Sequence, residues 1–134
     1  MPIDYAKADN YFIVQLYGED SHIKTLDLVE KAYKAYQKAS PSRTLPMITS
    51  MIGRTPSVPW DGIEKVSELH IDLYPMIHAI YVPGNHYLFE NAKLYVSHVN
   101  VKCPGVRWNV FDNLADLFRW LKKVEDKMKI DQRE

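Results

Sequence analysis

Apolar residues recur along this chain with two different spacings, which predict alternating strands and helices. Residues 45–52 and 76–82 (MIHAIYV) form two uncharged or nearly apolar runs flanked by turn residues, as is typical of central strands covered on both faces. Pro46 has no backbone N–H to donate to a sheet, so we expect it at the start of the first run. Both runs therefore predict buried strands.

Three further segments predict strands in less buried positions. Residues 3–5 and 11–17 (YFIVQLY) flank a polar turn and predict a hairpin. In residues 106–111 (VRWNVF), apolar and polar positions alternate, which indicates a strand with one more exposed face. We expect this last strand at an edge of the sheet.

Four segments show the three- and four-residue apolar spacing of helices that bury one face. The first follows Thr25, a candidate N-cap, and ends at Ser40 and Pro41. The others are expected to begin at Trp60 or Asp61, to run from about His86 to Val99, and to follow a cap at Asp112 or Asn113. The mixed charges of residues 128–134 predict a frayed tail.

The predicted order is β-β-α-β-α-β-α-β-α, which is an α/β fold. One domain over residues 1–134 accounts for it, with a mixed, mostly parallel sheet of about five strands and four helices. The opening hairpin supplies the antiparallel member. Because ligands and partners gather at the carboxyl ends of parallel strands, the loops 53–59, 83–85 and 112–113 share the edge of interest.

The amino-acid composition makes some classes of function unexpected for this chain. Seventeen Lys and Arg balance seventeen Asp and Glu, so bulk charge attracts neither a nucleic acid nor an anionic membrane. The single cysteine, Cys103, cannot form an internal disulfide, and we interpret it as an incidental thiol. No signal peptide and no apolar run of about 18 residues is recognised, so a cytoplasmic protein without a membrane span is expected.

The sequence offers no catalytic signature. Its five histidines lack metal-ligand spacing, and no HExxH, CxxC, GxSxG, GxGxxG or GxxxxGK[ST] motif occurs. We therefore expect no metal, no cofactor and no enzyme. His78 is interpreted as a strand residue with a hydrogen-bonded ring, and His86, beside Asn85 at a strand end, is the histidine best placed for a contact. Trp60, near Arg54, fits either buried packing or an exposed contact.

The order of elements, the strand MIHAIYV with its polar turn and helix, and the ending VRWNVFDNLADLFRWL together carry a resemblance. The chain resembles the STAS-like domains, the group that includes the sporulation anti-sigma factor antagonists, and within it a divergent branch of stand-alone bacterial proteins. The resemblance covers nearly the whole chain and implies a non-catalytic regulatory or protein-binding module.

In the antagonists, a serine at the start of the helix after the central strand is phosphorylated by a partner kinase. The corresponding segment here is MITSMIGRTPSVPWDG, which lacks their Asp-Ser-Ser-Gly pattern; the best matching positions are Ser57 and then Thr55. Phosphate at a helix N-terminus would meet free N–H groups and the helix dipole. The resemblance thus implies a regulatory kinase or a similar protein as the partner.

Two hypotheses follow for the same edge. The first is protein binding through residues 54–61, including Arg54, Trp60 and Asp61, together with the turn 83–86, including Asn85 and His86. The second is binding of a small apolar ligand or lipid below these loops, with Val58, Trp60 and Tyr81 at the mouth. A distant relation, the CRAL-TRIO lipid-transfer domain, motivates the second. The sequence leaves the oligomeric state open, a dimer included.

Overall fold

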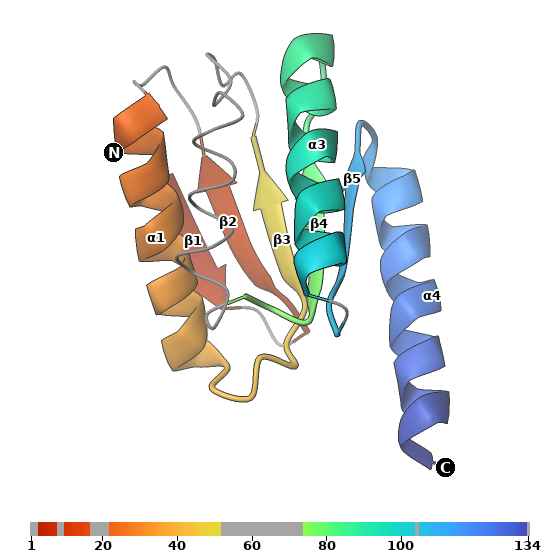
Figure 1. Cartoon of the computed structure of the whole chain (residues 1–134). Helices are drawn as coiled ribbons and strands as arrows, with labels where there is room; N and C mark the ends of the chain where they lie inside the picture. Colours follow the sequence, from red (N-terminus) through yellow and green to blue (C-terminus); the bar gives the residue numbers. More distant parts are fainter. Residues whose placement is uncertain (1–2, 8–9, 17–21, 52–73, 104, 134) are drawn as a thin grey trace.

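The computed structural model describes residues 3–7, 10–16, 22–51, 74–103 and 105–133. Helices and strands alternate along these ranges as the apolar spacing predicts (Figure 1). The helix expected from Trp60 or Asp61 lies outside the described residues. The described elements are β1 (Ile3–Lys7), β2 (Phe12–Leu16), α1 (His22–Ala39), β3 (Met47–Ser50), β4 (Ile77–Tyr81), α3 (His86–Lys102), β5 (Arg107–Phe111) and α4 (Leu114–Arg133).

The strands form one mixed sheet in the order β1-β2-β3-β4-β5. β1 and β2 pair antiparallel, with Tyr5 opposite Val14, whereas β2 to β5 are all parallel. The predicted hairpin, the mostly parallel sheet and the edge position of the last strand are confirmed. The carboxyl ends of four neighbouring strands consequently lie at one edge.

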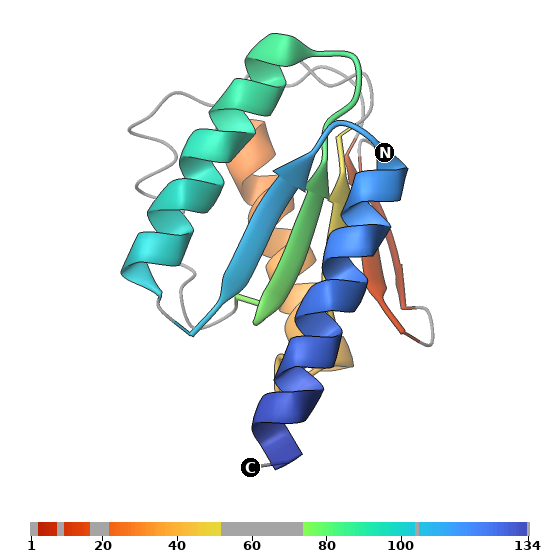
Figure 2. The same ribbon diagram turned by 90° about the vertical axis from the view of Figure 1, so that its right-hand side faces the viewer.

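Helices cover both faces of the sheet (Figure 2). α1 and α3 pack on the face that carries Phe12 and Met47, where they build the larger apolar cluster. α4 packs on the opposite face, where Leu117 and Leu121 are fully buried against Ile77 and Ala79 of β4. Among the described residues, no helix is long and apolar enough to cross a membrane.

Three element limits differ from the sequence prediction. α1 begins at His22, so Thr25 lies inside the helix instead of capping it; residues 22–25 contain no Gly or Pro that would stop a helix. α3 continues past Val99 to Lys102. α4 continues to Arg133, so residues 128–133 are helical instead of a frayed tail, again without an internal Gly or Pro.

Pro46 lies immediately before β3, as expected of a residue that cannot donate to a sheet. Its carbonyl still accepts a hydrogen bond of 2.9 Å from the backbone N–H of Phe12. The proline thus joins the start of β3 to β2 without needing an N–H of its own.

Trp108 of β5 is the centre of the larger cluster. Its indole N–H donates to the carbonyl of Pro75 at 2.9 Å, and its ring lies 4.7 Å from Tyr74 and 4.3 Å from His78, centroid to centroid. Tyr33 of α1 stands 6.3 Å away. Burying an indole N–H without a hydrogen-bond partner costs free energy. The hydrogen bond to Pro75 avoids this cost and allows the Trp108 ring to be buried.

The edge strand β5 is protected by asparagine side chains. The backbone N–H of Trp108 donates to Oδ1 of Asn100 at 3.1 Å, and the Asn100 amide donates back to the Trp108 carbonyl at 3.0 Å. The N–H of Val110 donates to Oδ1 of Asn109 at 2.8 Å. Unpaired backbone groups on an edge strand are a template for aggregation, and these contacts occupy the N–H and carbonyl of Trp108 and the N–H of Val110.

We expect Asn100→Ala to lower the free energy of unfolding by about 1 to 2 kcal/mol, because two hydrogen bonds between α3 and β5 are lost. Urea denaturation followed by tryptophan fluorescence measures this. Ser97→Ala, an exposed position on the same helix, is the matched control. Equal stability of the two variants would contradict a role for Asn100 in holding the edge.

Candidate functional site

The carboxyl edge of the sheet is the candidate site. The backbone N–H of Met51 donates to the carbonyl of Tyr81, and that of Val82 donates to Phe111, each at 2.9 Å. These bonds continue the sheet beyond the ends of β3, β4 and β5. They bring the turn 83–85 and the turn 112–113 side by side, as the parallel order predicts.

The first turn is fixed by glycine and asparagine. Gly84 has a φ of 69°, in the left-handed region that glycine adopts without strain. Asn85 then caps α3, its Oδ1 accepting from the N–H of Leu88 at 2.9 Å. The sequence prediction treats Asn85 as a contact residue, whereas the structure shows its side chain holding the helix start. His86 begins the helix and is exposed.

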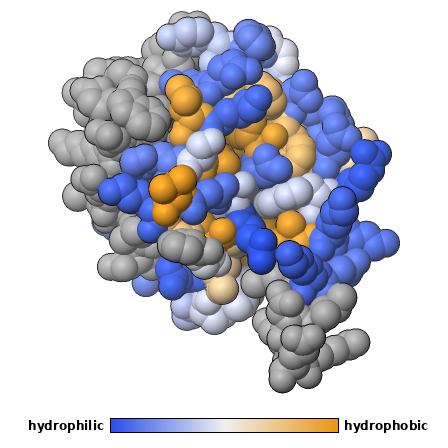
Figure 3. Space-filling view, turned by 45° about the vertical axis from the view of Figure 1, so that its right-hand side comes forward, coloured by the Kyte–Doolittle hydropathy of each residue, from blue (hydrophilic) through white to orange (hydrophobic). Residues whose placement is uncertain are grey.

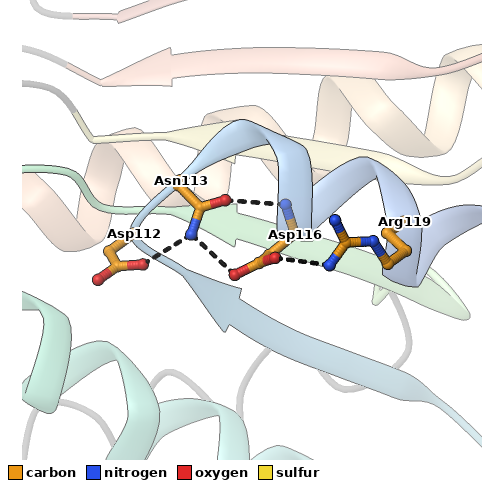
Figure 4. Close-up of polar contacts among 4 residues, drawn as sticks. All are labelled: Asp112, Asn113, Asp116 and Arg119. Carbon is orange, nitrogen blue, oxygen red and sulfur yellow. Dashed lines mark hydrogen bonds and ion pairs between the residues drawn. The ribbon is translucent and has the colours of Figure 1, made fainter.

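The second turn carries a chain of polar contacts (Figure 4). Asn113 is the N-cap of α4: its Oδ1 accepts from the N–H of Asp116 at 2.9 Å. The Asn113 amide donates to Oδ2 of Asp116 at 2.8 Å and to Oδ1 of Asp112 at 3.2 Å. Arg119 pairs with the other Asp116 oxygen at 3.0 Å. Of the two caps that the sequence predicts, Asn113 is therefore the one used.

Not every predicted site residue falls within this edge. Tyr81 ends β4, half-buried against the smaller apolar cluster on the α4 side. The remaining residues of the two binding hypotheses lie outside the described residues, so their contacts stay predictions. They are Arg54, Thr55, Ser57, Val58, Trp60 and Asp61. Phosphorylation of Ser57 or Thr55 also stays a prediction.

A second polar group lies in the core. Oγ1 of Thr49 and Nε2 of His78 are 2.7 Å apart on adjacent strands, and both side chains are buried. This confirms the predicted hydrogen-bonded ring of His78. Its Nδ1 has no hydrogen-bond partner within the part of the chain that the structure describes. Burial lowers the pKa of His78 to about 3, because the core does not solvate an imidazolium.

Three tyrosines adjoin this pair. The hydroxyl oxygens of Tyr33 and Tyr95 are 2.9 Å apart, and Tyr95 donates to Tyr74 at 3.3 Å. Burial raises the pKa of all three phenols above the ordinary value of a tyrosine. They are therefore neutral hydroxyls that form hydrogen bonds with one another inside the larger cluster. Tyr33 lies in α1 and Tyr95 in α3, whereas Tyr74 lies just before β4, so helical spacing does not predict its burial.

The described residues hold no group of three or more His, Cys, Asp or Glu side chains that could bind a metal ion. Thr49 and His78 are buried, and the side chains of Asn85 and Asn113 cap helices. What the exposed edge offers chemically is hydrogen bonding, two carboxylates and one apolar side chain, Leu114. Groups of these kinds can form polar and apolar contacts with another molecule.

The fold is an open α/β sheet covered on both faces, and comparisons with known proteins concern that fold alone. No family model matches the chain, and no curated protein matches it. An uncharacterised protein of the DUF3478 family from Shewanella loihica PV-4, which has a SpoIIAA-like fold, is similar in structure with a TM-score of 0.48 and 16% sequence identity. The match covers 89% of this chain and 91% of that protein.

We expect the stability of the protein to fall on acidification because of His78. Above about pH 6.5 the residue is neutral in both states and contributes no pH dependence. Between about pH 6.5 and its folded pKa of about 3, only the unfolded chain binds the proton. The free energy of unfolding therefore falls by about 1.4 kcal/mol per pH unit from this group.

Chemical denaturation between pH 4.5 and 7.5 measures this slope. His78→Gln keeps a neutral hydrogen-bonding side chain at position 78 and should lose this contribution to the slope. His86→Gln, which removes an exposed imidazole, serves as the control. A slope unchanged in His78→Gln would refute the assignment of the acid sensitivity to His78.

Proposed function

We propose that the chain is a non-catalytic protein-interaction domain that binds a partner through the carboxyl edge of its sheet. The edge surface comprises the exposed residues of the two adjoining turns together with the first residue of α3 and the first residue of α4. Its members are Gly84, His86, Asp112, Asn113 and Leu114.

The observation that carries the proposal is that both turns are fixed before any partner arrives. Asn85 holds the start of α3, Asn113 holds the start of α4, and the bond from Val82 to Phe111 joins the strands between them. A surface that is already ordered loses little conformational entropy on binding. Such an edge is suited to recognition.

The side chains of the edge surface suggest the chemistry of the partner. Leu114 is 47% exposed and provides an apolar anchor. The exposed carboxylates of Asp112 and Asp116 lie within one helical turn of it, beside the positive N-terminus of α4. A partner with an apolar side chain next to Arg or Lys would complement both features.

The regulatory part of the proposal rests on the sequence resemblance to the anti-sigma factor antagonists. In that hypothesis, modification of Ser57 or Thr55 controls the binding that the edge surface provides. The chemistry of the proposed partner does not depend on this modification, so binding and its regulation are separate hypotheses.

We expect Leu114→Glu combined with His86→Ala to abolish capture of a specific partner from the native host. The double variant removes the apolar anchor and one exposed ring while leaving both asparagine caps in place. Affinity capture with the tagged full chain, followed by mass spectrometry, identifies the proteins that are lost. Isothermal titration with the purified partner should then show at least about a tenfold weaker affinity, the equivalent of 1.4 kcal/mol.

Phe118→Glu is the matched control. Phe118 is 45% exposed on the same helix, one turn farther from the edge. Circular dichroism should show both proteins folded. Capture that survives Leu114→Glu with His86→Ala but is lost in Phe118→Glu would place the contact away from the edge and refute the proposal.

A further inference from the structure

We draw no further inference here: the strongest candidate, the apolar patches that lie among polar residues on the surface that includes α3 and α4 (Figure 3), carries none, because nothing in the structure shows what covers them.

Discussion

The enclosure of Trp108 is the contact on which the rest of the structure depends. Its indole N–H is satisfied by the carbonyl of Pro75, just before β4, and its backbone is held by Asn100 of α3. Its ring packs against Tyr33 of α1. One residue of an edge strand therefore contacts two helices on the same face, α3 through its backbone and α1 through its ring. These hydrogen bonds remove the penalty of about 1 to 3 kcal/mol that each unsatisfied buried N–H would otherwise impose on this burial.

The same cluster explains why the polar groups of the core are inert while those of the edge are available. His78 and Thr49 are buried on two adjacent strands, and the His78 ring contacts Tyr33 and Trp108, so the hydrogen bond between Thr49 and His78 is shielded from water. At the carboxyl ends of those strands, the chain must turn and expose its side chains. The side chains of Asn85 and Asn113 cap the helices that follow these turns and hold both turns in place at the edge of the buried core. This difference between the buried core and the exposed turns supports the proposal that a partner binds at the edge surface.

The local apolar spacing predicted the strands and helices well, but it predicted the ends of the helices and the contacts of individual side chains less well. MIHAIYV indicated a buried strand because its apolar residues need cover on both faces, and the alternation in VRWNVF indicated an edge because half of its residues are polar. The ends of the helices were harder to predict. α1 begins before Thr25, and α4 extends through residues 128–133. At these ends only helix propensity and neighbouring packing determine where a helix starts or stops. At the edge, α3 begins at His86 as predicted, while a contact role for His86 stays a prediction; Asn85, expected as a contact residue, caps α3.

The sequence by itself determined the alternation of strands and helices, the antiparallel opening hairpin and the parallel edge where the turns gather, since these follow from periodicity and from short connections. Only the tertiary structure decided which side chains meet across that frame. Thr49 reaches His78 over 29 residues, and Trp108 reaches Pro75 over 33, through sheet neighbours that local spacing does not specify.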